Sequence, residues 1–231
     1  MPHSSGYVLR TRPYSDTRLL VDLFTKDAGR ITCMARPAKL RGKVPKGHLQ
    51  AFRVLRLNWQ GQRDLSNLLQ TEESHRHRIP ATKLVHGLYL NELLLRLMPL
   101  SLPQQATYSL YQQTLQLLVE SAEPMLVVMQ FELALLEQLG YHLNLWEDDQ
   151  NAVSIVSGHD YHYCPDKGVW PITKGLTRLR GIVISGQLLI ALRDSASMTL
   201  ADYHALRHFL DALWKQLIHK PLNSRQLLRF S

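Results

Sequence analysis

The sequence is poor in cysteine, which excludes a fold held together by disulfide bonds. Its 231 residues include two cysteines, Cys33 and Cys164, which lie far apart in the chain. A chain of this length buries a sizeable hydrophobic core without covalent cross-links. We therefore expect two free thiols, as is typical of proteins in a reducing compartment.

Long apolar runs are also absent, and with them the usual signs of secretion or membrane insertion. The first fifteen residues contain no apolar run, so they predict no signal peptide. The most apolar segment, residues 124–139, is too short to span a bilayer and is interrupted by Gln130, Glu132, Glu137 and Gln138. The sequence therefore predicts a cytoplasmic protein.

Cations are missing from the middle of the chain, although the net charge of the whole protein is +8. Residues 97–166 contain nine Asp and Glu residues and no Lys or Arg. Residues 1–96 contain 17 Lys and Arg against 7 Asp and Glu, and residues 167–231 contain 10 against 3. Two basic ends thus flank an acidic middle, which predicts two electropositive surfaces for an anionic partner and a central segment with another role.

Motifs of enzymes and of metal sites are lacking as well. Gly42-Lys43 is no phosphate-binding loop, because the upstream glycine and the downstream Ser or Thr are missing. Neither paired carboxylates around a metal nor a nucleophile–base motif is apparent. His159, His162 and Cys164 lie close together, but a structural zinc site needs four ligands, usually as two close pairs. We therefore expect no enzymatic activity, no cofactor and no bound metal.

What the sequence does contain, at its start, is a series of short segments in which apolar and polar residues alternate. This period of two predicts strands, separated by turn residues, over residues 7–12, 19–25, 30–36, 52–59 and 65–72. A basic loop, residues 37–47, connects the third strand to the fourth and is expected to be flexible. Five short strands with a long loop at this position fit a small barrel such as the OB-fold.

From Lys83 onward the apolar period becomes helical. It predicts helices over residues 83–98, 103–118, 124–139, 187–191 and 200–219. The predicted class is therefore α+β, with an N-terminal five-stranded OB-fold barrel over residues 1–79 and a helical domain over residues 80–231. Residues 142–185, within that domain, are expected to be irregular and free of metal.

The cations of the predicted barrel are candidates for nucleic-acid binding, because OB-folds bind single strands with a cationic groove and stacking aromatic residues. The third strand directs Ile31, Cys33 and Ala35 inward and its arginines outward, although a merely solvated strand face is the alternative. The candidate aromatic residues are Tyr7, Tyr14, Phe24 and Trp59, with burial in the core as the alternative for each. The predicted DNA-binding residues are Arg10, Arg12, Arg30, Arg36, Lys39, Arg41, Lys43, Lys46, Arg53 and Arg56.

Four segments, taken together and in order, resemble one known family. They are RPYSDTRLLVDLFTKDAGR (12–30), GLYLNELLLRL (87–97), FELALLEQLGY (131–141) and KPLNSRQLL (220–228). The chain resembles, over nearly its whole length, the proteobacterial type of the RecO family of DNA-repair and recombination-mediator proteins. The resemblance implies an OB-fold, a helical middle and an irregular or zinc-bearing module in the C-terminal half.

The resemblance also implies a function and partners. Members of the family bind single- and double-stranded DNA and anneal complementary strands without ATP. They contact the single-stranded DNA-binding protein SSB and RecR, so that RecA can load on SSB-coated DNA. A nucleoid-associated protein of the cytoplasm is therefore expected.

The chain departs from the family pattern at two places. Some members carry four zinc-binding cysteines, whereas this chain keeps only Cys164, so its module is expected to be a degenerate one held by packing. Members also follow the third strand with a sequence of the K-G-A-R type. Here the corresponding residues are Arg36, Pro37, Ala38 and Lys39, which retain charge but stiffen the start of the loop.

The acidic tail of SSB, which ends in apolar residues, requires an apolar groove beside cations. The helical middle supplies apolar surface but no cation of its own, so the cations must come from neighbouring segments. The predicted partner-binding residues are Lys83, Arg96, Phe131, Leu135, Arg178, Arg180 and Lys215. The alternative function is that of a basic protein–protein adaptor without a direct role on DNA. A sequence-specific regulator ranks last, because no recognition helix is evident.

Overall fold

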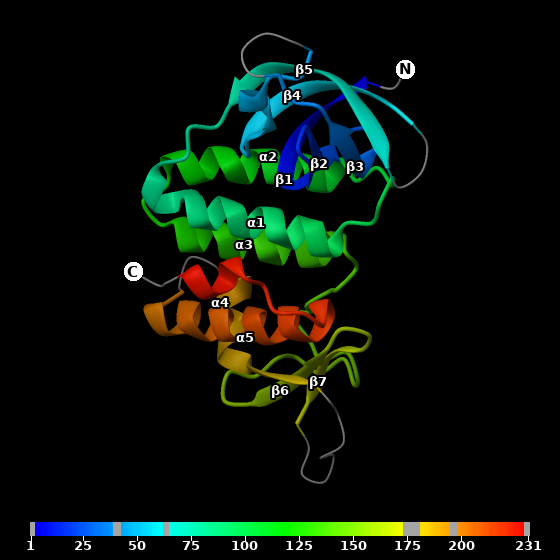
Figure 1. Ribbon diagram of the computed structural model, residues 1–231. Helices are drawn as coiled ribbons and strands as arrows, with labels where there is room; N and C mark the ends of the chain where they lie inside the picture. Colours follow the sequence, from blue (N-terminus) through cyan, green and yellow to red (C-terminus); the bar gives the residue numbers. More distant parts are fainter. Residues whose placement is uncertain (1–2, 39–42, 62–64, 173–180, 195–197, 229–231) are drawn as a thin grey trace. The chain divides into compact units, whose positions relative to one another are not determined.

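The alternating segments at the start of the chain form five strands that close into a barrel (Figure 1). The strands are β1 (His3–Ser15), β2 (Arg18–Thr25), β3 (Gly29–Ala35), β4 (Arg53–Gln60) and β5 (Ser66–Arg76). Their order is β1-β2-β3-β5-β4, with β1 closing antiparallel on β4 and β3 pairing in parallel with β5. The predicted α+β class with an N-terminal OB-like barrel is confirmed.

The computed structural model describes residues 3–38, 43–61, 65–172, 181–194 and 198–228. The chain forms two compact units, the first comprising residues 1–128 and 222–231 and the second residues 129–221. The first unit contains the barrel and the helices α1 (Leu84–Leu97) and α2 (Gln105–Glu120). Among the described residues, no helix combines the length and the apolar character needed to cross a membrane. The predicted division of the chain after residue 79, at the end of the barrel, stays a prediction.

The interior of the barrel is filled by the apolar residues at alternate strand positions. Val21, Leu23 and Cys33 are completely buried there. Val44 and Leu49, from the connection between β3 and β4, belong to the same core cluster. This connection includes the short 3-10 helix η1 (Lys46–Leu49). The loop expected to be flexible is therefore anchored over its described second half, because burial of two apolar side chains ties it to the barrel.

The outer face of β1 and β2 is covered in part by the helices of the first unit. Tyr7 and Phe24 are completely buried and contact the rings of Tyr108 and Tyr111 of α2. Tyr7 and Tyr111 meet edge to face with ring centroids 5.0 Å apart, an arrangement that the ring quadrupoles favour. Figure 1 shows α1 and α2 beside the barrel. Tyr7 and Phe24 therefore belong to the core.

The C-terminal segment returns to the first unit and is fastened to α1. The carboxylate of Glu92 accepts hydrogen bonds from the backbone N–H of Asn223 at 3.1 Å and of Ser224 at 2.9 Å. It also accepts one from the hydroxyl of Ser224 at 2.6 Å. These bonds satisfy donors at the start of the 3-10 helix η4 (Ser224–Leu227), which explains why a carboxylate lies there.

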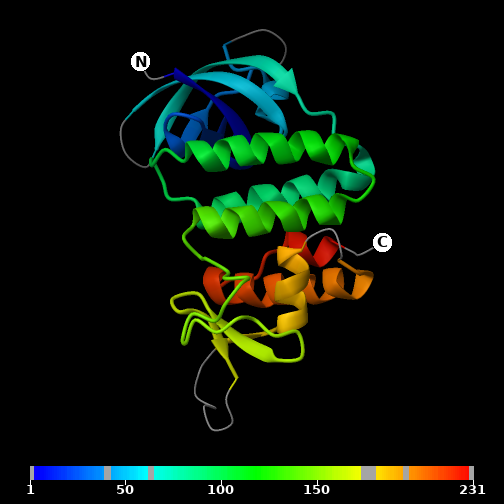
Figure 2. The same ribbon diagram turned by 180° about the vertical axis from the view of Figure 1, so that it is seen from behind.

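The second unit contains most of α3 (Pro124–Gln138), followed by a small sheet and two helices, α4 (Gly186–Arg193) and α5 (Leu200–Ile218). Helix α5 begins with a capping box in which Thr199 and Asp202 satisfy each other's backbone N–H groups. The helices α4 and α5 contact each other and run in different directions (Figure 2). The helices predicted from the apolar period are confirmed.

The segment expected to be irregular, residues 142–185, contains an antiparallel sheet. Its strands are β6 (Asp160–Cys164), β7 (Gly168–Pro171) and β8 (Ile182–Ser185), in the order β7-β6-β8. The expectation was wrong for these strands because each has only four or five residues. Alternation over so few positions cannot be distinguished from a loop in the sequence. Residues 173–180 of this segment lie outside the described residues.

Candidate nucleic-acid interface

A buried carboxylate lies on the outer face of β1, β2 and β3. Asp22 of β2 pairs with Arg10 of β1 on one side and with Thr32 of β3 on the other. Asp22 is 1% exposed. It accepts hydrogen bonds from Arg10 Nε at 2.9 Å, from Thr32 Oγ1 at 2.9 Å and from Arg12 Nη2 at 3.5 Å. The strand register therefore places two arginines on one carboxylate.

The two guanidinium groups remain accessible although Asp22 is buried. The side chains of Arg10 and Arg12 are 48% and 45% exposed. Since two positive charges share one negative charge, the group as a whole keeps a positive charge. An exposed guanidinium presents several N–H donors in a plane, which suits the oxygen atoms of a phosphate.

Arg30 of β3 lies close to this pair. Its Nε donates to the carbonyl oxygen of Met98, at the end of α1, at 2.9 Å. Burial lowers the pKa of Arg30, the negative charge of Asp22 opposes this shift, and the positive charge of Arg10 adds to it. We call Arg10, Arg12 and Arg30 the arginine cluster, because all three interact with one another or with Asp22.

Three loop cations of the barrel are exposed. They are Arg36, which directly follows β3, and Lys43 and Lys46 in the connection to β4. Within the described parts of the chain, none of the three forms an ion pair. The Lys43 carbonyl accepts a hydrogen bond from the N–H of Thr71 at 2.8 Å, which holds this part of the loop on β5. The predicted residues Lys39 and Arg41 lie outside the described residues.

The two predicted cations of β4 differ in exposure. Arg53 is 8% exposed and donates to the side chains of Glu73 and Gln50. Arg56 is exposed, and its nearest carboxylate oxygen, from Glu72, lies at 3.6 Å. Arg53 is therefore engaged in holding the barrel together, whereas Arg56 stays accessible on the surface.

Of the four aromatic candidates for base stacking, one is on the surface. Tyr14, near the end of β1, is 57% exposed. Trp59 is 5% exposed and lies in the barrel core with the other apolar side chains, and Tyr7 and Phe24 are buried under α2. Tyr14 follows Arg12 by two residues in the same strand, so an accessible ring stands close to the arginine cluster.

Most of the described residues predicted to bind a partner have structural roles. Phe131 and Leu135 are 1% and 0% exposed, so they form the core and cannot line an open groove. Lys83 Nζ donates to the carbonyl oxygens of Val119 at 3.2 Å and Ser121 at 2.6 Å, which satisfies the end of α2.

The other predicted partner residues differ in their surroundings. Arg96 pairs with Glu92 at 3.5 Å and, with Arg10, lines a shallow surface pocket of about 420 Å³. Lys215 is exposed on α5. The remaining two, Arg178 and Arg180, lie outside the described residues.

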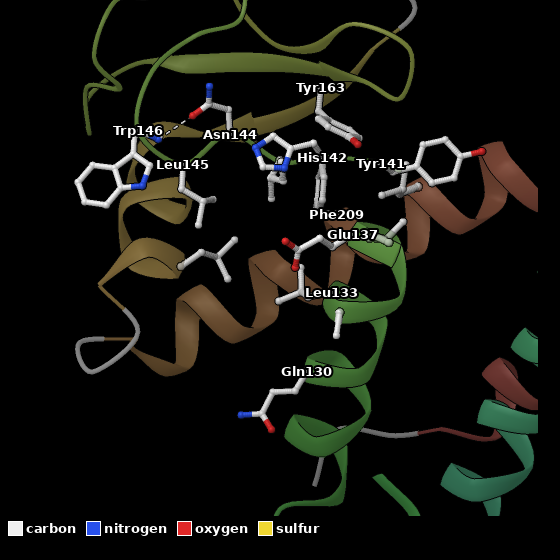
Figure 3. Close-up of a pocket in the computed structure, with 15 residues that line it drawn as sticks. Gln130, Leu133, Glu137, Tyr141, His142, Asn144, Leu145, Trp146, Tyr163 and Phe209 are labelled. Carbon is white, nitrogen blue, oxygen red and sulfur yellow. Dashed lines mark hydrogen bonds between the residues drawn. The ribbon is translucent and has the colours of Figure 1, made fainter. Parts of the chain in front are cut away.

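An apolar pocket of about 480 Å³ lies in the second unit (Figure 3). Leu133 of α3 and Phe209 and Leu213 of α5 line it, together with Tyr141 and Trp146 from the chain after α3. Trp146 is 67% exposed, and the guanidinium carbon of Arg193 lies 4.8 Å from its ring centroid. The sequence does not reveal this pocket, because its lining comes from five separate segments, including Tyr163 of β6 and Leu192 of α4, none of which has a distinctive pattern.

The second unit also contains the single cysteine that the resemblance relates to a zinc module. Cys164 is buried at the end of β6. Among the described residues, no three or more His, Cys, Asp or Glu side chains are grouped as metal ligands. The predicted absence of a metal stays a prediction.

A closed five-stranded barrel with a cationic outer face, continued by a helical region, defines an α+β protein of the OB-barrel class. Two family models match the chain: "Recombination protein O N terminal" over residues 1–75 and "Recombination protein O C terminal" over residues 81–226. The chain belongs to the RecO family of DNA-repair proteins.

Curated relatives match the chain over nearly its full length. A DNA repair protein RecO of Psychromonas ingrahamii is 31% identical over 96% of both chains. A protein of the same name from Nitrosospira multiformis is 32% identical over 97% of this chain and 93% of its own length. A third, from Alteromonas mediterranea, is 33% identical over 96% of this chain and 95% of its own. Membership of this family supports a function in DNA repair and recombination.

Proposed function

We propose that the outer face of the barrel binds DNA and that the protein is a recombination mediator without enzymatic activity. In this role it anneals complementary strands without ATP, on the nucleoid in the cytoplasm. The observation that carries the proposal is the arginine cluster, whose exposed members Arg10 and Arg12 are held on Asp22. The exposed loop cations Arg36, Lys43 and Lys46 add positive charge to the same barrel.

Annealing needs charge neutralisation rather than bond cleavage. Two complementary strands repel each other through their phosphates, and cations that displace condensed counterions reduce this repulsion. Guanidinium and ammonium groups contact phosphate oxygens without reading sequence, so the same face can bind single and double strands. An exposed ring such as Tyr14 can stack on an unpaired base, which favours the single strand.

The salt dependence of binding to a fluorescent oligonucleotide tests the proposal. We expect Arg10→Ala/Arg12→Ala and Arg36→Ala/Lys43→Ala/Lys46→Ala to bind more weakly than the unaltered protein. On single strands the slope of log K against log salt should flatten by roughly 0.7 for each phosphate that the variant no longer neutralises. The same variants should anneal complementary strands more slowly.

A matched control separates specific contacts from total charge. Lys26 and Arg78 are exposed cations of the first unit outside the predicted site. The variant Lys26→Ala/Arg78→Ala removes as much charge as Arg10→Ala/Arg12→Ala and should retain most of the affinity. Equal loss in the two double variants would contradict the assignment of the face. If the unaltered protein showed no salt-dependent binding, the adaptor function would be favoured instead.

We further propose that the protein cooperates with SSB and RecR in loading RecA on SSB-coated DNA. The apolar pocket of the second unit supports the contact with SSB, whose tail is acidic with an apolar end. The pocket is lined mainly by apolar side chains and has Arg193 beside Trp146 at its rim. Lys215 is exposed on the same helix as the lining residues Phe209 and Leu213, but two positions after Leu213 it lies on another side of α5.

A titration with a labelled peptide of the acidic SSB tail tests this contact. We expect Arg193→Ala to weaken binding, whereas Lys215→Ala and Lys220→Ala, at exposed cations outside the pocket lining, should not. Full affinity in Arg193→Ala would refute the assignment of the pocket. Annealing of SSB-coated strands with and without RecR then measures the proposed mediator activity directly.

A further inference from the structure

Asp22 is a negative charge beneath the exposed arginines of the face that we propose binds a polyanion. Judged by charge alone, it should weaken DNA binding. Its burial makes the position more unusual, because a buried carboxylate is costly unless donors satisfy it. The side chain of Asp22 is 2% exposed and is satisfied by side chains from both neighbouring strands.

The contacts of Asp22 constrain its two oxygens differently. Thr32 Oγ1 donates to Oδ1 at 2.9 Å, which fixes the carboxylate relative to β3. Arg10 directs both Nε and Nη2 to Oδ2, each at 2.9 Å, and Arg12 Nη2 reaches the same oxygen at 3.5 Å. A forked contact of this kind fixes the plane of a guanidinium as well as its position. The contacts with the buried Asp22 carboxylate therefore fix the orientation of Arg10 and, to a smaller extent, that of Arg12.

We infer that Asp22 is a positioning residue for phosphate binding, which holds the guanidinium groups of Arg10 and Arg12 in the orientation that receives the DNA backbone. The inference rests on the proposed function of the barrel face. Long arginine side chains lose rotamer freedom when they bind a ligand. A carboxylate that has already ordered them removes this entropy loss from the binding step.

The substitution Asp22→Asn separates positioning from simple electrostatics, because the two predict opposite signs. It removes one negative charge under the face, so electrostatics alone would tighten DNA binding. The asparagine side chain presents to the arginines either an N–H₂ group, which repels their N–H donors, or an amide oxygen, which is a weaker acceptor than a carboxylate. The contact of Arg10 Nε and Nη2 with one carboxylate oxygen is therefore lost. We expect affinity for a single-stranded oligonucleotide to fall by about three- to tenfold, as for the loss of order in one or two long side chains.

Two further variants keep the test decisive. Asp16→Asn, at an exposed position in the turn between β1 and β2, makes the same change in charge and should leave binding unchanged or slightly tighter. Arg10→Lys keeps the charge and replaces the fork by a single ammonium group, so it should also weaken binding. Thermal unfolding verifies that each variant is folded. If Asp22→Asn does not fold, the DNA affinity of Arg10→Lys tests the inference in its place.

A double-mutant cycle measures whether Asp22 acts through the arginines. In an Arg10→Ala/Arg12→Ala background, Asp22→Asn should cause no further loss of affinity, because nothing remains to be positioned. Tighter binding of Asp22→Asn, unchanged binding of Arg10→Lys, or an additive loss in the combined variant would each overturn the inference. If Arg10→Ala/Arg12→Ala itself has no effect, the proposed DNA-binding face fails, which is a distinguishable result.

Discussion

Glu132 of α3 is completely buried and accepts hydrogen bonds from both terminal nitrogens of Arg207 in α5. The distances are 2.5 Å for Nη1 and 2.9 Å for Nη2. The indole N–H of Trp214 donates to the same carboxylate at 2.6 Å. A charged pair thus joins α3 to α5 inside the second unit, in a segment whose other side chains are mostly apolar.

We expect Glu132→Ala to destabilise the protein strongly, because it leaves the buried Arg207 guanidinium with only the partly exposed Asp211, at 2.9 Å, as a counter-charge. Removal of one partner from a buried ion pair typically costs about 3–5 kcal/mol. Urea unfolding followed by Trp fluorescence measures the change in the free energy of unfolding. The exposed ion pair of Arg56 with Glu72 is the control, and Glu72→Ala should change stability little.

Replacement of both members of the buried pair should cost less than replacement of one. In Glu132→Leu/Arg207→Met, apolar side chains of similar size fill the space and no buried charge is left alone. A double variant less stable than Glu132→Ala would contradict this account of the pair.

Asn91 connects α1 to both α2 and the barrel. Its Nδ2 donates to the carbonyl oxygen of Leu9 at 3.1 Å, and its Oδ1 accepts from the hydroxyl of Tyr111 at 2.5 Å. Asn91→Leu leaves both groups buried without these partners, at a cost of about 1–3 kcal/mol for each. Tyr111→Phe removes one hydroxyl and should cost less. Equal destabilisation of the two variants in urea unfolding would argue against the linking role.

His77 should make stability depend on pH. Burial lowers the pKa of His77 to about 4, and the neighbouring His75 adds to the shift. In the unfolded chain, the imidazole of His77 has a pKa of about 6.5 and is protonated below that pH. In the folded protein it stays neutral until about pH 4. The free energy of unfolding should therefore be highest above pH 6.5 and fall as the pH is lowered toward 4.

Urea unfolding at several pH values, compared with His77→Gln, tests this dependence. The variant lacks the imidazole, so its stability should fall less steeply between pH 6.5 and 4, although removal of the hydrogen bond with Tyr7 lowers stability at every pH. Some slope should remain, because burial also lowers the pKa of His86. Identical slopes in the two proteins would contradict the prediction, as would an NMR titration of His77 with a midpoint near 6.5.

Cys33 should be unreactive in the folded protein. It is completely buried in the barrel, and burial raises its pKa to about 12. At pH 8 the nucleophilic thiolate is therefore scarce and inaccessible. In a Cys164→Ser variant, we expect mass spectrometry to show alkylation of Cys33 in urea but not under native conditions. Modification of the native protein at the rate of a free thiol would show that the barrel opens readily.

The regular elements of the fold were predictable because their signals are local. Alternation in residues 30–36 separates the inward Ile31, Cys33 and Ala35 from the outward arginines, and the structure has this arrangement in β3. The helical period after Lys83 likewise matches α1. The sheet of β6, β7 and β8 was missed because its strands are too short for a period to appear.

The roles of individual cations were less predictable. Arg53 and Arg56 stand three residues apart and look equivalent as cations of one predicted strand, yet Glu73 engages Arg53 while Arg56 stays exposed. Phe131 and Leu135 looked suitable for a partner because they are apolar, but burial inside the second unit removes them from its surface. Exposure depends on what packs against a side chain, which spacing along the chain does not reveal.

The sequence by itself determined the strands of the barrel, the helices, the basic ends and the acidic middle, because each depends on side chains close together in the chain. Only the tertiary structure decided which charges meet. Arg10, Asp22 and Thr32 come from three strands. The register between those strands brings Arg10 and Thr32 to the carboxylate of Asp22. Glu132 meets Arg207 across 75 residues for the same reason, since pairing in space follows from packing and not from sequence distance.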